Sequence, residues 1–191
     1  MYVVVVGGLL FLAFAYFAFA QAAAARNGGQ SAADAAALAA AQDVRDELSD
    51  GFFEHLGDPE AWPQWLMAEG NFAGAGYNAA AAQLADENDS KLLGSVELTE
   101  VNNYPAFTAR IETLFTVGDS VIPDTENTHA KADATAVIEP RCEITPDSDP
   151  SKVIEIDCEG SGRWKIDPKT PIDELVDLPM AHDLFSVHLA E

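Results

Sequence analysis

The chain has 191 residues, with 32 acidic and 10 basic side chains, and a formal net charge of −22 at pH 7. This length predicts one folded head plus a helix, or at most two small domains. So acidic a surface repels phosphates and anionic lipid head groups, which argues against nucleic-acid binding and predicts that the folded part stands off a membrane. Solubility outside the cell explains the charge, and a weak cation-binding surface is the alternative.

An uncharged apolar segment opens the chain, because no charged side chain precedes Arg26. Residues 1–25 are long enough to cross a bilayer as a helix. A cleaved secretion signal could end at Ala20, but a basic n-region is missing and the apolar run is too long. An ordinary membrane anchor predicts positive flanking charge, which nothing before Met1 supplies. We therefore expect that a basic leader has been removed and that Met1 is a processed end.

The predicted helix continues beyond the thickness of a bilayer. Strong helix formers extend to about Leu48, where residues 49–51 (SDG) are expected to end it. A helix of that length is roughly 70 Å long, over twice a bilayer core. Gly28 and Gly29 predict a kink or a stretch that unwinds locally. Small side chains in the Ala-rich second half let helices approach closely, which favours packing among copies of the chain. The residues expected to pack between subunits are Val3, Val6, Leu10, Phe14, Phe17, Ala33, Ala37 and Leu38.

Several segments resemble the TadE/TadG-type pilin-like proteins of Tad (Flp) pilus systems, most of all the TadG-related proteins of Gram-positive actinobacteria. They are residues 8–15 (GLLFLAFA), 21–22 (QA), 26–28 (RNG), 30–41 (QSAADAAALAAA) and 183–190 (DLFSVHLA). The resemblance implies export, leader cleavage by a prepilin-type peptidase, and a role in a surface pilus or its assembly machinery. One departure is Val5, because most such pilins carry a glutamate at the fifth mature position. In such pilins this glutamate is thought to pair with the amino terminus of a neighbouring subunit. Either Met1 is not the mature end, or this branch assembles without that pairing.

Residues 51–191 are expected to form a head containing an antiparallel sheet. Period-two alternation over 96–99, 109–117 and 132–138, a cysteine hairpin and residues 163–166 predict about five strands in one meander. The turn-rich segment between Cys142 and Cys158 places the two cysteines opposite each other, and Ile144 opposite Ile156. We therefore predict a Cys142–Cys158 disulfide in an oxidising compartment. A helix is expected over 77–85 and a closing strand over 183–190.

The sequence contains no pattern that predicts a catalytic, cofactor-binding or metal site. The histidines lack metal-ligand spacing, although His182 and His188 could meet in space, and there is no nucleophile elbow or phosphate loop. The acidic clusters over 86–89 and 147–149 could hold Ca²⁺, but neither matches an EF-hand, and solvated turns explain both. Arg26 and Asp34 are the first charges on the helix, about 12 Å apart, and an axial stagger could pair them between neighbouring copies. The alternative is that both face solvent.

The sequence as a whole predicts an α+β, pilin-like fold in which a long helix (1–50) packs on an antiparallel sheet head (51–191) with one disulfide. The expected function is a structural, non-enzymatic subunit of a cell-surface type IV (Tad/Flp-like) pilus, inserted in the membrane before assembly. Its expected partners are copies of itself in a helical homopolymer, the assembly machinery and the prepilin peptidase, with no cofactor. A minor pseudopilin or membrane-anchored accessory protein of that machinery and an anchored ligand-binding ectodomain are the alternatives.

Overall fold

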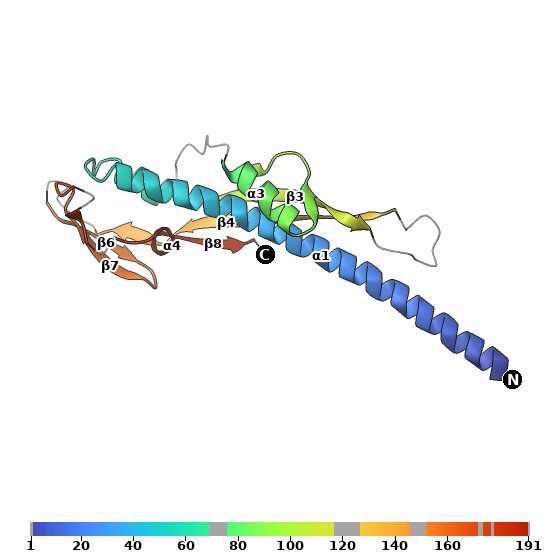
Figure 1. The fold of residues 1–191 in the computed structure, drawn as a ribbon. Coiled ribbons are helices and arrows are strands. Elements are labelled where there is room, and N and C mark those ends of the chain that lie inside the picture. Colours follow the sequence, from blue (N-terminus) through green and yellow to red (C-terminus); the bar gives the residue numbers. More distant parts are fainter. Residues whose placement is uncertain are drawn as a thin grey trace.

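The computed structural model describes residues 2–68, 76–116, 127–145, 152–171, 174–176 and 178–190. One long helix forms the axis of the molecule, and two antiparallel sheets lie along its C-terminal half (Figure 1). The helices are α1 (Tyr2–Glu54), α2 (Trp62–Leu66), α3 (Gly76–Glu87) and α4 (Ala181–Leu184). The strands are β1 (Ser90–Leu92), β2 (Glu97–Val101), β3 (Tyr104–Thr116), β4 (His129–Pro140), β5 (Cys142–Ile144), β6 (Ile154–Cys158), β7 (Gly162–Ile166) and β8 (Phe185–Leu189). The predicted α+β fold, a long N-terminal apolar helix packed on an antiparallel sheet, is confirmed.

Helix α1 is longer than the sequence predicted, because it runs through residues 49–51 to Glu54. A helix this long forms because its sequence consists mainly of good helix formers and contains no proline. Gly51 does not end the helix. A Cβ atom at that position would overlap the ring of Trp65, so this glycine serves the close approach of the α2 segment. The neighbouring Phe52 is fully buried and packs edge-on against Trp62, at 5.3 Å between ring centroids.

The strands form two sheets, where the sequence predicted one meander of about five strands. In the first sheet the order is β1-β3-β4-β8, and β2 pairs with β3 beside β1. In the second sheet the order is β5-β6-β7. The expected period-two alternation is confirmed on β3, where Phe107, Ala109 and Ile111 are fully buried and the intervening Arg110 is exposed. The cysteine hairpin therefore builds a separate sheet with β7 and does not extend the first.

The disulfide is confirmed in the predicted register. Cys142 pairs with Cys158 and Ile144 with Ile156 across β5 and β6, and the two sulfur atoms are bonded. Both cysteines are buried. Residues 146–151, between these strands in the sequence, lie outside the described residues, and so does the expected acidic cluster at 147–149.

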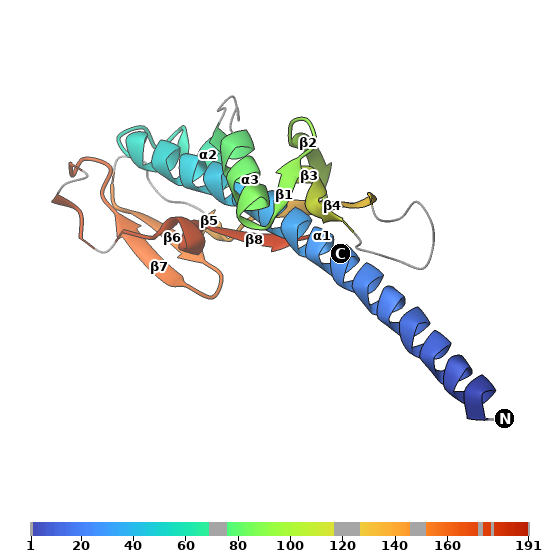
Figure 2. The same cartoon turned by 45° about the vertical axis from the view of Figure 1, so that its right-hand side comes forward.

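The core is a layer of small side chains between α1 and the first sheet. Ala32, Ala36 and Ala40 on α1 are fully buried, and they belong to one apolar cluster with Ala109 and Ala136 of the sheet. Small residues on both sides let the helix lie close to the strands. Helix α3 covers another side of α1 (Figure 2). It matches the helix expected over 77–85.

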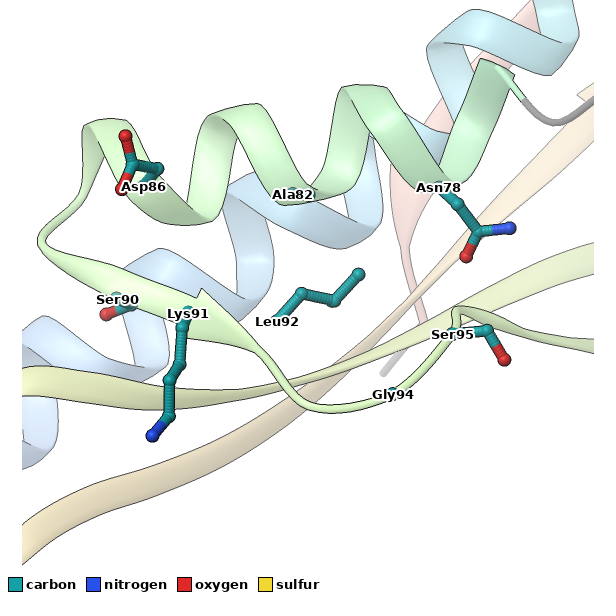
Figure 3. Close-up of a pocket in the computed structure, with 8 residues that line it drawn as sticks. All are labelled: Asn78, Ala82, Asp86, Ser90, Lys91, Leu92, Gly94 and Ser95. Atoms are coloured by element: carbon teal, nitrogen blue, oxygen red, sulfur yellow. The ribbon is translucent and has the colours of Figure 1, made fainter.

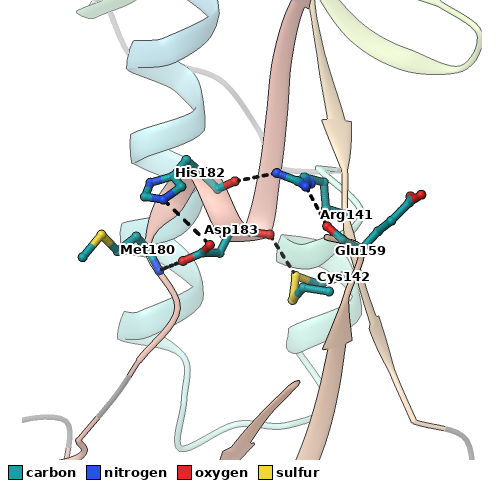
Figure 4. A network of polar contacts seen from close by, with 7 residues as sticks. Arg141, Cys142, Glu159, Met180, His182 and Asp183 are labelled. Atoms are coloured by element: carbon teal, nitrogen blue, oxygen red, sulfur yellow. Dashed lines mark hydrogen bonds and ion pairs between the residues drawn. A yellow bond between two sulfur atoms is a disulfide. The ribbon is translucent and has the colours of Figure 1, made fainter. Parts of the chain in front are cut away.

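A polar network joins the second sheet to the α4–β8 segment (Figure 4). The guanidinium of Arg141 donates to the carbonyl oxygens of His182, at 3.2 Å, and Glu159, at 2.6 Å. The Asp183 carboxylate accepts the Met180 N–H at 2.8 Å. Burial acts to raise the pKa of Asp183, but this bond and others more than offset it, so its pKa lies below the ordinary value. The expected closing strand is thus present as β8, held at its start by this network.

Candidate assembly surface

Helix α1 has two halves with different surroundings. Residues 2–24, which we call the stalk, project from the rest of the molecule (Figures 1 and 2). Val3 is 85% and Phe19 82% exposed, and the first buried side chain along the helix is Ala25. From there the helix is built into the head, by which we mean the described residues from Ala25 onward. The division between the exposed and the buried part of the helix therefore lies at residue 25.

The stalk is apolar around its whole circumference. It contains no charged residue, and its exposed large apolar side chains occupy every side of the helix. A helix that is apolar all round is stable only when it is surrounded by lipid or protein. The apolar part of α1 meets the length and hydropathy of a membrane span, with a mean hydropathy of 2.5. The residues that we predicted to pack between subunits from this region are all exposed: Val3, Val6, Leu10, Phe14 and Phe17.

The Ala-rich half corrects the sequence-based assignment. Ala33 and Ala37 have no exposed surface, because they pack in the core of their own head. Leu38 is half-buried against the same core. Ala33 and Ala37 therefore cannot contact a neighbouring copy, and the close packing expected of them takes place within the chain. Any apolar packing between copies along α1 would therefore use the stalk, whereas exposed polar residues such as Arg26 lie beyond it.

Gly28 and Gly29 lie where the stalk enters the head, and α1 stays helical through both. A Cβ atom on Gly28 would lie 3.1 Å from the Phe115 ring, and one on Gly29 would lie 3.4 Å from the Thr113 methyl group. The local unwinding that was expected here is not seen. The two glycines instead leave room for the end of β3 to reach the helix, which joins the head firmly to the base of the stalk.

The first charges of the chain stand at this same level. Arg26 is exposed, and the half-buried Asp34 accepts a hydrogen bond from Gln30 Nε2 at 2.8 Å, one helical turn away. The same amide group lies 3.4 Å from the Asp133 carbonyl oxygen. Within the described residues neither Arg26 nor Asp34 forms an ion pair in its own chain. The pairing of these two residues between copies stays a prediction.

The rest of the head is an acidic surface with scattered ion pairs. Lys91 lies 3.2 Å from Glu112, and this hydrogen-bonded lysine lowers the pKa of the Glu112 carboxyl. Arg163 lies 2.8 Å from Asp157, which raises the pKa of the guanidinium. Exposed pairs of this kind contribute little to stability. Because acidic residues outnumber basic ones by 22, the heads carry a strong mutual repulsion.

The described residues hold no group of three or more His, Cys, Asp or Glu side chains arranged for a metal ion. The acidic cluster at 86–89 is the end of α3 followed by a turn, in which Asn88 Nδ2 donates to the Leu84 carbonyl oxygen at 2.8 Å. His182 and His188 contact different carboxylates. These are Asp183, at 3.8 Å, and Glu139, at 3.3 Å.

A shallow hollow lies between α3 and β1 (Figure 3). Two of its polar side chains are already used within the chain. Asn78 Oδ1 accepts the Val96 N–H at 2.8 Å, and Lys91 pairs with Glu112. A small-molecule site needs several polar groups that converge on the ligand, and this hollow does not offer them. Among the described residues, the exposed large apolar side chains are concentrated on the stalk.

Comparison with known protein families, curated proteins and solved structures found no match for this chain.

Proposed function

We propose that this chain is a structural subunit of an extracellular filament of the type IV (Tad/Flp-like) pilus kind. Its stalks bundle in the filament core, and its acidic heads face outward. The membrane holds the stalk before assembly, and a prepilin-type peptidase and an assembly machinery deliver it to the filament. The observation that carries this proposal is the exposed stalk, apolar on every side and continuous with the core helix of the head.

The size of the exposed surface supports an assembly role. Thirteen large apolar side chains between Tyr2 and Phe19 are more than half exposed. Burying one such side chain contributes about 1.5–3 kcal/mol, so covering all of them is worth on the order of 20–40 kcal/mol. Lipid covers this surface before assembly. Neighbouring stalks cover it in a filament, because a two-helix contact would leave the far side of each stalk bare.

The rigid connection between stalk and head favours a filament over a simple anchor. A tethered ectodomain works with a flexible linker, but here one helix passes from the stalk into the core without a break. The orientation of the head relative to the stalk is therefore fixed. A helical assembly needs that property, because every head must repeat the same position around the common axis.

Electron microscopy of material sheared from producing cells tests the proposal, combined with mass spectrometry of the chain in that material. We expect filaments composed mainly of this chain. A chain that stays in the membrane fraction as single copies would refute the filament and favour an accessory or ligand-binding ectodomain. Phe14→Lys should abolish filaments by placing a charge in the stalk bundle. Val176→Lys, the matched control, adds the same charge at an 84% exposed head position and should leave them intact.

The predicted pairing of Arg26 with Asp34 between copies gives a finer test of the same filament. Asp34→Arg should block assembly by placing like charges together, and the double variant Arg26→Asp/Asp34→Arg should restore it. Asp34→Asn is the control for the local bond, because its amide oxygen still accepts from Gln30. Normal filaments from Asp34→Arg alone would show that both side chains simply face solvent.

A further inference from the structure

Among the described strands, the first sheet ends at two edges that pair with no further strand, and their geometry is matched. One edge is formed by β2 together with the short β1, and the other is β8. The registers connect them row by row: Leu98 pairs with Phe107, Phe107 with Ala136, and Ala136 with Leu189. The two edges therefore lie at the same level of the sheet. In Figures 1 and 2, β4 and β8 run lengthwise beside the C-terminal half of α1, so these edges face sideways from the long axis.

The backbone groups that point away from each edge follow from the hydrogen bonds of the ladder. On the β8 side, Arg141 N–H donates to the Leu184 carbonyl, and Ala190 N–H donates to the Thr135 carbonyl. Bonded pairs alternate in an antiparallel ladder, so Val187 and Leu189 turn their N–H and C=O groups outward. Within the described part of the chain only one bond to these outward groups is present, from the His188 ring to the Leu189 carbonyl at 3.2 Å.

The same alternation applies to β2. The two-residue turn at Asn102 and Asn103, both with positive φ, makes Val101 and Tyr104 a bonded pair. Leu98 and Glu100 consequently turn their N–H and C=O groups outward. The outward groups of β2 thus occur in the same row as those of β8, since Leu98 and Leu189 share a row.

We propose that neighbouring copies join edge to edge, with β8 of one head pairing antiparallel with β2 of the next. The occupant of each edge is a second copy of this chain, so the inference rests on the proposed filament. Leu98 of one copy then lies opposite Leu189 of the other, and Glu100 opposite Val187. Each of these two pairs exchanges two N–H···O=C bonds, and the first sheet becomes continuous from head to head.

Strand direction selects this pairing. Successive strands in the order β2-β3-β4-β8 are antiparallel, so β2 and β8 run in opposite directions. Copies whose stalks point the same way therefore present antiparallel β8 and β2 edges to each other. An antiparallel contact between two β8 strands needs a two-fold axis perpendicular to the strands, which would point the stalks in opposite directions. The β8–β2 contact uses two different surfaces, as an open polymer requires.

Side chains at the two edges are complementary. Leu98 is 49% exposed although it stands in a row with the fully buried Phe107, and the contact would cover it beside Leu189. The β2 edge carries Glu97 and Glu100, which oppose β2–β2 pairing, whereas β8 carries no acidic or basic residue except His188. Charged side chains and short length are the usual protection of a free edge, and β8 lacks the first. The β8–β2 contact therefore places the acidic β2 edge of one copy against the β8 edge of the next, which carries no acidic residue.

Cysteine cross-linking in the assembled full-length protein tests the proposal. Chains with Leu98→Cys and chains with Leu189→Cys are co-expressed and oxidised mildly, without prior reduction, so that the buried native disulfide stays intact. We expect disulfide-linked dimers only when both variants are present, and a ladder of multimers from the double variant. The yield should exceed that of a Val176→Cys/Leu189→Cys pair by at least roughly tenfold, because fixed neighbours react at a far higher effective concentration.

Two outcomes would refute the β8–β2 contact between copies. Both can be distinguished from a failure of the proposed function. Filaments that contain the variants without cross-linking would refute it while leaving the filament standing. Dimers of Val187→Cys alone would show a two-fold β8–β8 contact instead. Absence of filaments in the microscopy of the unmodified chain would refute the proposed function itself.

A proline pair separates assembly from folding. Val187→Pro removes an outward N–H, so the head should fold normally while cross-linking and assembly are lost. His188→Pro removes an N–H that bonds to β4, so it should lower the melting temperature of the head. Normal assembly by a folded Val187→Pro chain would refute the edge contact.

Discussion

The division of α1 at residue 25 makes a direct prediction about truncation. Removing residues 1–24 should leave a folded, water-soluble head, because none of the described residues before Ala25 is buried. Removing residues 1–37 takes away five buried alanines, namely Ala25, Ala32, Ala33, Ala36 and Ala37. At about 0.8 kcal/mol for each methyl group, their burial alone is worth about 4 kcal/mol. That is a large part of a typical stability of about 5–15 kcal/mol, before counting the sheet surface that is left bare.

Circular dichroism melting and size-exclusion chromatography of the two truncated chains test whether the head folds without residues 1–24 and without residues 1–37. The 25–191 chain should melt cooperatively, elute as a monomer, and keep the helical signal of residues 25–54. The 38–191 chain should be unfolded or aggregated at the same temperature. An unfolded 25–191 chain would show that the stalk contributes to the stability of the head. A stable 38–191 chain would show that the alanine layer does not hold the sheet.

Three further predictions concern the head. Replacing Cys142 and Cys158 by alanine together should cost about 3 kcal/mol, because the bridge closes a loop whose ends are 16 residues apart; melting curves with and without reductant measure the loss. Gly51→Ala should lower the melting temperature, because the added Cβ atom would overlap the Trp65 ring. Gly8→Ala is the control and should not lower it, because a Cβ atom there has no other atom within 4 Å. Equal effects of the two substitutions would contradict the packing argument. The lowered pKa of Asp183 means that the folded head binds fewer protons than the unfolded chain near pH 4. Its contribution is therefore present above the unfolded pKa and lost as pH falls through the folded pKa, so Asp183→Asn should flatten the acid side of a stability-versus-pH curve.

Local patterns in the sequence predicted the disulfide hairpin and the long N-terminal apolar helix correctly. Turn formers between two short alternating strands fix which residues face each other, and this places Cys142 opposite Cys158 without any knowledge of the rest of the fold. The apolar run before Arg26 likewise has no other use than burial in lipid or protein. Both features depend only on residues that lie close together in the chain, and this is why the sequence alone could predict them.

The packing partner of the Ala-rich half of α1 could not be predicted from the sequence. Small side chains indicate that something packs closely, but they do not say whether the partner belongs to the same chain or to another. The sequence predicts that Ala33 and Ala37 pack between copies, whereas the structure buries them in the core of their own head. Gly51 shows the same ambiguity, because a glycine that ends a helix and a glycine that admits an aromatic ring look alike in a sequence. In both cases the deciding partner is distant in the chain.

Burial of the Ala-rich half also changes what an assembly of this chain must look like. In the proposed filament, the copies would bury stalk against stalk only up to residue 24, about 35 Å of helix. Beyond that level the helix is enclosed on the sides covered by α3 and the first sheet, so neighbouring heads must meet through their own surfaces. These surfaces carry a strong acidic charge, which opposes contact except where uncharged backbone is offered. The free β8 edge is such a place, and backbone hydrogen bonding there needs no charge complementarity to the acidic head.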